Sequence, residues 1–182
     1  MPQPYSLAKF DGSTSAQIEN ALESSDVVYF ERCPIELPTE ADCEFLRSEL
    51  PEQAKLKNIS YHPESDSVPG FDASPEITAR VTDLLRDHRA KVGEFLQRQL
   101  PNLAPGWSLG TSSFRGIEEG GRGLNPRASS EIVHIDAGAY GATNGNRILR
   151  FFVNLNPDRD RIWGTKGSFR SLFEANAALP EA

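Results

Sequence analysis

The sequence predicts an α+β fold, with a helical amino-terminal layer over residues 1–105 followed by a β-rich region over residues 106–182. Three observations predict it. Apolar residues recur at helical spacing over 75–100, β-branched and aromatic runs follow Gly106, and Gly- and Asn-rich loops separate those runs. A chain of 182 residues can bury one core but is short for two ordinary domains, so we expect a single domain.

The amino-terminal layer is predicted to contain short helices and one or two strands. Hydroxyl side chains at 13–15 precede AQIENALESS and predict a capped helix, and DVVYFER (26–32) predicts a strand. Thr39 followed by Asp42 predicts a second short helix, which Pro51 stops. The following KNISYHPESDSVPGFDASP is dense in Pro, Ser and Asp, and predicts a long loop.

The strongest predicted helix runs from Ser74 to about Leu100, with proline at its first helical position. Its apolar face is formed by Ile77, Val81, Leu84, Leu85, Val92, Phe95, Leu96 and Leu100. This pattern indicates a buried supporting helix without chemistry of its own, and we expect His88 on it to be a solvated surface histidine.

The β-rich region contains three predicted strands, 107–116, 131–137 and 147–156. We expect the closing GSFRSLFEANAALPEA to be helical rather than the end of a barrel.

The composition of the chain limits the classes of ligand and the compartment that we expect. The net charge of −7 argues against general nucleic-acid binding, whereas the basic excess between Arg115 and Arg170 suits an anionic small molecule. No apolar run approaches the ~20 residues of a membrane span, and the amino terminus lacks the pattern of a signal peptide. We therefore expect a cytoplasmic protein in which Cys33 and Cys43 stay reduced.

His134 and Asp136 are the candidate metal ligands. They stand in EIVHIDA, and residues two apart in a strand point to the same face, so an imidazole and a carboxylate can meet one metal ion. Two histidines and one carboxylate form the facial triad of iron(II) oxygenases, which leaves open positions for co-substrate and dioxygen. An isolated His-x-Asp is weak, but apolar flanks, the following AGAYGATNGN and an arginine-bearing run strengthen the hypothesis.

The stretch HIDAGAYGATNGNRILRFFVNLNPDRDRIW (134–163) resembles the Kdo hydroxylases, bacterial iron(II)- and 2-oxoglutarate-dependent oxygenases acting on 3-deoxy-D-manno-oct-2-ulosonic acid. The resemblance includes the His-x-Asp-Ala opening, the Arg-Ile-Leu-Arg run and Asn-x-Asn-Pro. It extends back to Ser113-Phe114-Arg115 and forward through Gly167–Phe169.

The resemblance implies a double-stranded β-helix, or jelly-roll, with helices packed on its major sheet. It also implies iron(II), 2-oxoglutarate as co-substrate and ascorbate as a candidate accessory reductant. The implied substrate is the Kdo of the lipopolysaccharide inner core or a lipid A precursor, reached from the cytoplasm by peripheral contact with the inner membrane. The family's second histidine ligand follows the His-x-Asp pair by many tens of residues. Since no histidine follows His134 here, we expect an incomplete barrel in this chain.

Arginine suits the 2-oxoglutarate carboxylate because its planar fork grips a carboxylate with two hydrogen bonds. Arg147 and Arg150 should point to opposite faces of their strand, and Asn154 on the Arg150 side makes that row the more polar one. Arg150 is therefore the first candidate, and Arg115 is the second.

Arg122 and Arg127 lie in the loop GIEEGGRGLNPRASS, which leads into the metal strand. They are candidates for contacting the sugar carboxylate or a phosphate. Two alternatives to the oxygenase stay open at this point, a jelly-roll binding protein without metal and a cupin-type metal enzyme of another chemistry, such as an isomerase.

Overall fold

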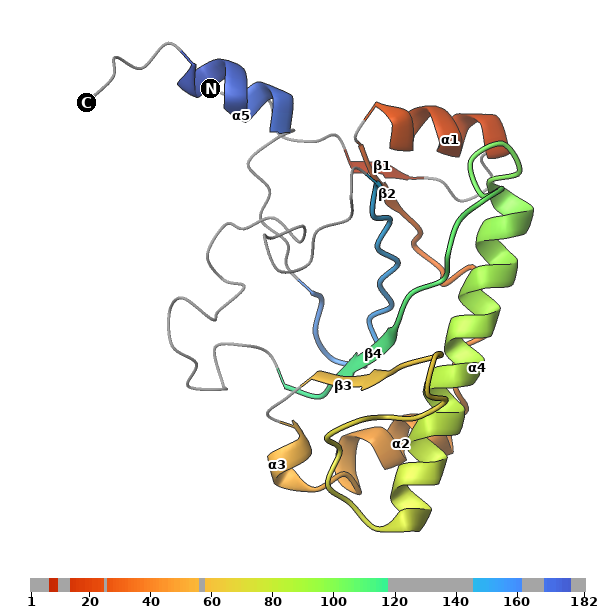
Figure 1. Ribbon diagram of the computed structural model, residues 1–182, viewed down its shortest axis with the longest axis vertical. Helices are drawn as coiled ribbons and strands as arrows, with labels where there is room; N and C mark the ends of the chain where they lie inside the picture. The colour runs from red at the N-terminus through yellow and green to blue at the C-terminus, as the bar shows by residue number, and fades with distance from the viewer. Residues whose placement is uncertain are drawn as a thin grey trace. The chain divides into compact units, whose positions relative to one another are not determined.

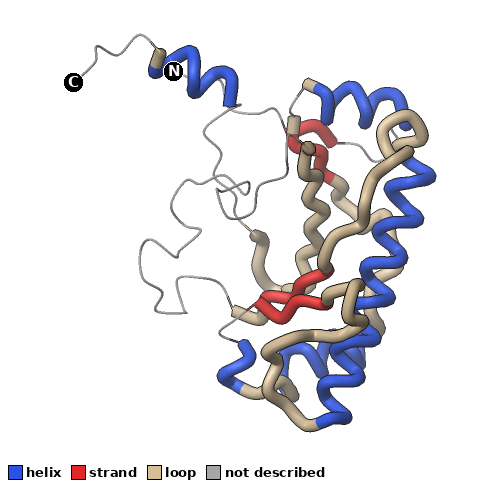
Figure 2. Tube along the Cα trace, viewed as in Figure 1, coloured by secondary structure: helices blue, strands red, loops and turns tan. Residues whose placement is uncertain are grey.

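The computed structural model describes residues 7–9, 14–24, 26–55, 58–117, 146–161 and 169–177 (Figures 1 and 2). The chain divides into two compact units, one formed by Met1–Arg32 with Ile132–Ala182 and the other by Cys33–Glu131. The described elements are helices and two two-stranded sheets, and neither sheet closes into a barrel within these residues. The predicted mixture of helices and strands is confirmed, whereas the jelly-roll and the single domain remain predictions.

In the first unit a short helix connects two parallel strands. β1 (Leu7–Lys9) pairs with β2 (Val27–Tyr29), and α1 (Ser15–Glu23) lies between them in the sequence and contacts β2 (Figure 1). Parallel strands need a crossover rather than a tight turn, and α1 supplies it. Thr14 accepts a hydrogen bond from the Gln17 backbone N–H, while the Gln17 side chain accepts one from the Thr14 N–H. The predicted capped helix and strand are both confirmed, with the strand shorter than expected.

Residues 146–161, in the same unit, form neither helix nor strand, so the predicted strand 147–156 is wrong. A strand requires a hydrogen-bonded neighbour, and within the described part of the chain no backbone ladder includes these residues. Side-chain amides organise the segment instead. The Asn154 Nδ2 donates to the Arg159 carbonyl at 2.7 Å, and the Asn156 Oδ1 accepts from the Asp158 N–H at 2.9 Å. Such asparagine-capped turns replace a backbone ladder locally.

The predicted closing helix is confirmed as α5 (Phe169–Asn176). None of the helices in the described part of the chain has the length and apolarity that a membrane span requires.

The second unit contains α2 (Glu40–Ser48), α3 (Glu52–Lys55), β3 (Asn58–Tyr61), α4 (Pro75–Gln99) and β4 (Ser112–Arg115). The predicted caps are confirmed. The Thr39 side chain accepts from the Asp42 N–H, and the Ser74 side chain accepts from the Ile77 N–H. On α4 the predicted apolar face points inward, and Val81 and Leu100 are 0% and 1% exposed.

Arg80 joins α4 to α2. Its guanidinium lies 4.0 Å from the centre of the Phe45 ring, and its Nη2 lies 3.0 Å from the Asp42 Oδ1. Hydrogen bonds from Thr39 and then from Arg80 hold the pKa of the Asp42 carboxyl below its usual range. Asp42 therefore takes part both in the N-cap of α2 and in the ion pair between α2 and α4.

β3 and β4 form an antiparallel pair in which Asn58 faces Arg115 and Tyr61 faces Ser112. Both strands contact α4 (Figure 2). β3 falls in the stretch predicted to be a loop, so that prediction is wrong for residues 58–61. Its partner lies more than fifty residues along the chain, which no local composition reveals.

Residues 107–111, predicted to belong to a strand, form none. Their carbonyls bind α4 instead of a neighbouring strand. The Arg89 Nη2 donates to the Leu109 carbonyl at 2.8 Å, and its Nε donates to the Gly110 carbonyl at 2.9 Å. Gly93, one turn further along α4, lies against Leu109, since a Cβ added at Gly93 would be 2.5 Å from the Leu109 Cδ1. β4 begins at Ser112, which pairs with Tyr61, the last residue of β3.

The turn after β3 depends on Asp66, which has a left-handed backbone conformation with φ of 47°. The Tyr61 hydroxyl donates to the Asp66 Oδ1 at 2.8 Å, and the Arg86 Nε donates to the same oxygen at 2.8 Å. Arg86 first and Tyr61 second hold the pKa of the Asp66 carboxyl below its usual range. This carboxylate connects the turn to both β3 and α4.

We expect Gly93→Ala to destabilise the protein by about 1 kcal/mol. Alanine in a helix interior normally stabilises by about 1 kcal/mol relative to glycine, but overpacking against Leu109 costs roughly 1–3 kcal/mol. In a Leu109→Ala background the same substitution should become stabilising. Urea denaturation of the wild type, the two single variants and the double variant measures the coupling free energy between the two positions. If Gly93→Ala stabilises the protein in both backgrounds, Leu109 does not constrain Gly93.

We expect Asp66→Asn to lower stability at neutral pH, and the deficit to disappear in acid. Because the folded-state pKa of Asp66 is lowered, its stabilisation is present above the unfolded value of about 3.9 and is lost as the pH falls through the folded value. Asparagine tolerates the left-handed conformation, so the change tests the charge. The measurement is the free energy of unfolding against pH, with Asp72→Asn as the control. A deficit independent of pH would contradict the role of the charge.

Candidate functional site

The two predicted metal ligands, His134 and Asp136, and the two predicted substrate arginines, Arg122 and Arg127, lie outside the described residues. Among the residues that are described, no group of three or more His, Cys, Asp or Glu side chains could hold a metal ion. The metal site and the substrate loop therefore remain predictions.

His88 is not the solvated surface histidine that we predicted. The side chain is half-buried on α4, and burial lowers the pKa of its imidazole below the usual range. Nearby Asp87 opposes this shift and Lys91 adds to it. His88 is thus held towards its neutral form within the helical layer.

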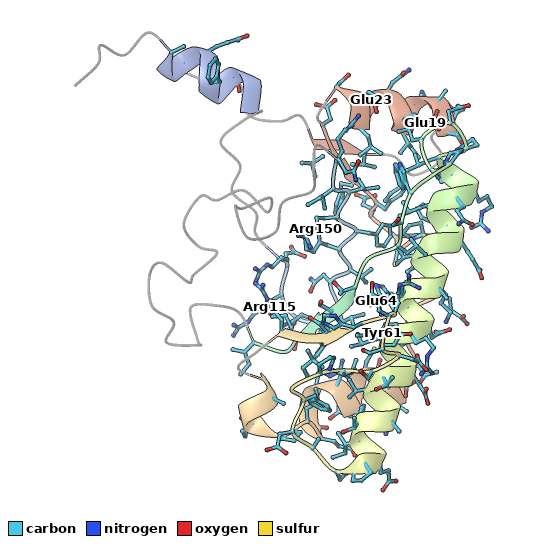
Figure 3. The ribbon with its side chains drawn as sticks, in the orientation of Figure 1. Glu19, Glu23, Tyr61, Glu64, Arg115 and Arg150 are labelled. Atoms are coloured by element: carbon cyan, nitrogen blue, oxygen red, sulfur yellow. The ribbon has the colours of Figure 1, made fainter. Side chains whose placement is uncertain are left out.

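The structure shows Arg147 in an ion pair and Arg150 at an exposed position of the same segment. Arg147 Nη1 donates to both carboxylate oxygens of Glu23, on α1 of the same unit, at 2.8 and 3.0 Å. Arg150 is exposed on the same segment and is labelled in Figure 3. The Glu23 ion pair gives Arg147 a structural partner, and the prediction that the two arginines point to opposite faces of a strand does not hold because residues 146–161 form no strand.

The argument from Asn154 for an interior position of Arg150 is weakened. In the predicted strand, Asn154 lies on the same side as Arg150, and its polarity indicated that this side faces the inside of a barrel. Its amide instead holds the turn before Arg159, with Nδ2 donating to that carbonyl and Oδ1 accepting from the Asn156 N–H at 3.1 Å. A turn explains this side chain without a barrel interior, so the candidacy of Arg150 rests on its exposure and its place in the sequence.

Arg115 lies at the end of β4, where the sheet orients it (Figure 3). Its Nε donates to the Oδ1 of Asn58, its partner in the antiparallel register, at 3.0 Å. Two residues before Arg115 on β4, the Ser113 hydroxyl lies 2.7 Å from the hydroxyl of Ser60, its partner on β3. Residues two apart share a face of a strand. Ser113 and Arg115 therefore share one face of β4.

We call Asn58, Ser60, Ser113 and Arg115 the polar face of the β3–β4 pair. The opposite face carries Ile59 and Tyr61, each 4% exposed, and Ser112, 7% exposed. Arg115 and Asn58 are both exposed, and Ser60 is half-buried. The pleat thus places four polar side chains together, and the apolar face packs inward.

Ser112, on the buried face, has a buried hydroxyl with no hydrogen-bond partner within the described part of the chain. The buried face is therefore not wholly apolar, and a polar atom sits where a methyl group would fit the surroundings better.

Sequence reasoning missed Asn58 and Ser60 because it placed them in a loop. The alternation in Asn58-Ile59-Ser60-Tyr61, polar then apolar twice, is the period of a half-buried strand and could have identified it. The surrounding Pro, Ser and Asp residues obscured that alternation.

A family model described as 3-deoxy-D-manno-oct-2-ulosonic acid (Kdo) hydroxylase matches residues 7–182. No curated protein and no solved structure matches the chain. The matched span includes the polar face, Arg150 and the predicted metal pair, so the resemblance seen in residues 134–163 extends to nearly the whole chain. The chain therefore belongs to the Kdo hydroxylase family, and this membership implies an enzyme that hydroxylates the sugar acid Kdo.

Proposed function

We propose that this protein is an iron(II)- and 2-oxoglutarate-dependent oxygenase that hydroxylates the Kdo of the lipopolysaccharide inner core or a lipid A precursor. The family match over residues 7–182 carries the proposal. The His134-x-Asp136 pair supports it, since an imidazole nitrogen and a carboxylate oxygen are two of the three donors of an iron(II) facial triad. Bound iron(II) would supply the chemistry in which dioxygen gives one oxygen atom to the C–H bond, making C–OH, and the other to 2-oxoglutarate, which becomes succinate and CO2.

The protein's own share of the reaction is binding and orientation. We assign His134 and Asp136 to the metal and Arg150, with Arg115 as the second candidate, to a 2-oxoglutarate carboxylate. Arg147 is assigned to the ion pair with Glu23, both of whose carboxylate oxygens its guanidinium bonds. Arg122 and Arg127 are assigned to the anionic groups of the sugar. A guanidinium fork gives each carboxylate a fixed orientation, and orientation of the reacting groups is a large part of catalysis.

The proposed fold is a jelly-roll to which the described strands contribute, with α4 packed on the outside of β3 and β4. We place the enzyme in the cytoplasm, with peripheral contact to the inner membrane where it meets a lipid-linked sugar. Ascorbate is the proposed accessory reductant. The acidic net charge of −7 supports a small anionic ligand at a local basic site rather than a nucleic acid.

We expect His134→Ala to abolish iron-dependent release of succinate from 2-oxoglutarate. Loss of a residue that merely orients a metal ligand costs about 10- to 100-fold, so loss of the ligand itself should exceed about 100-fold. The readouts are succinate release and iron bound per chain. His62→Ala, which changes a histidine outside the proposed centre, should retain both. Wild-type turnover in the His134 variant would refute the metal assignment.

We expect Arg150→Ala to raise the KM for 2-oxoglutarate by about 10- to 100-fold, because a hydrogen-bonded charge pair contributes roughly 1.5–3 kcal/mol. The KM for the sugar should change far less. Arg147→Ala, on the same segment, is the matched control, and it should lower thermal stability slightly while both KM values stay near those of the wild type. Equal increases of both KM values in the Arg150 variant would indicate a structural role instead.

A further inference from the structure

We propose that His88 makes the packing of α4 sensitive to mild acid, because a proton on its imidazole places a positive charge on the apolar row of this helix. The proposal is independent of the oxygenase assignment, since His88 belongs neither to the metal pair nor to the candidate anion sites. Through this residue, pH acts on the helix that supports the β3–β4 pair.

His88 occupies a position of α4 that belongs to a row of apolar side chains. The row is formed, in alternating steps of four and three residues, by Val81, Leu85, His88, Val92 and Phe95. Val81, Leu85 and Phe95 are 0%, 6% and 7% exposed. Val92 and His88 are half-buried. The imidazole therefore belongs to the packed side of the helix rather than to its solvated side.

The strands that contact α4 bring an uncharged surface to it. The face of the β3–β4 pair opposite to the polar face consists of Ile59, Tyr61, Ser112 and Phe114. Tyr61 is the one titratable residue of these four, and its hydroxyl donates to Asp66. α2 meets α4 at Arg80, which pairs with Asp42 eight residues before His88. A surface of apolar and hydroxyl groups disfavours a charge on the row that packs against it.

The charges that act on His88 come from its own helix. Burial lowers the pKa of the imidazole, Asp87 opposes this shift and Lys91 adds to it. The Lys91 Nζ lies 2.8 Å from the Asp87 Oδ2 and 2.8 Å from the Glu36 Oε2. Because the Asp87 carboxylate is already paired with Lys91, it offsets only part of the cost of a half-buried imidazolium.

This arrangement fixes the direction of the pH effect. In an unfolded chain a histidine takes up a proton at a pKa of about 6.5, whereas burial keeps the folded His88 neutral to lower pH. Unfolding therefore binds a proton between the two values. The stabilisation is complete above the unfolded value and is lost as the pH falls through the folded value. Below both values, the folding equilibrium constant is lower by about tenfold for each pH unit that separates them.

The middle of α4 is where the proton should act first. A charged imidazole is more stable in water than on the packed side of a helix, so the turns that carry it should open more often in acid. Leu85 and Val92, its neighbours in the row, then lose part of their packing. Because β3 and β4 both contact α4, the opening also removes support from the strand pair.

The test is urea denaturation and amide hydrogen exchange of the full chain between about pH 8 and about pH 5, without iron or co-substrate. The wild type should lose stability and α4 protection as the pH falls. His88→Gln replaces the imidazole with an amide that takes up no proton, so both losses should become smaller. His62→Gln, which changes a histidine outside α4, is the matched control and should keep the acid response of the α4 amides. Since all three proteins contain His134, its contribution cancels in the comparison.

NMR titration of the wild-type imidazoles gives a readout that needs no variant. The His88 ring should titrate with a midpoint below about 6.5. Lys91→Met should raise that midpoint, because it removes a repelling cation and releases Asp87 from its ion pair. A wild-type midpoint at or above about 6.5 overturns the inference, and so does a loss of stability in acid that His88→Gln leaves unchanged. If His88→Gln does not fold, the wild-type midpoint decides. Absence of oxygenase activity would alter none of these measurements.

Discussion

Packing of the β3–β4 pair against α4 is the constraint on which the second unit depends. Ile59 and Tyr61 are buried beside a helix whose own apolar row is buried, and burial of such side chains stabilises a fold by roughly 1.5–3 kcal/mol each. Because side chains alternate between the two faces of a strand, the residues between the buried ones must point to the opposite face. Arg115 and Asn58 face outward because their neighbours face α4. The outward position of Arg115 is thus a consequence of the core.

Several arginines in the described part of the second unit hold the fold, whereas Arg115 lies on the polar face of the β3–β4 pair. Arg80 joins two helices, Arg86 holds a turn, and Arg89 binds two backbone carbonyls. The helix that we expected to carry no chemistry therefore supplies most of the ion pairs among the described residues of this unit. In the other unit, Arg147 has a comparable role through Glu23. Counting basic residues in the sequence could not distinguish these roles, since structural and binding arginines look alike there.

Local chemistry explains which features were predictable. The caps at Thr14, Thr39 and Ser74 and the apolar face of α4 depend on residues within a turn or two, and all are confirmed. Features that depend on distant partners were missed or misplaced. β3 lies in a stretch that was predicted to be a loop, and residues 107–111 and 147–156, which were predicted to form strands, form none. For the site, the family was predictable from the motifs in residues 134–163, whereas the place of Asn58 depends on a pairing that composition does not reveal.

The separation of the two faces of the β3–β4 pair has a consequence for how this protein can change. Substitutions at exposed positions usually alter stability by less than about 0.5 kcal/mol, whereas those in a core cost several times more. Asn58 and Arg115 lie on the tolerant side, while Ile59 and Tyr61 lie on the intolerant side. The outward-facing positions of these two short strands can therefore vary while folding stays intact, so that mutational robustness and adaptability coexist within two paired strands of four residues each.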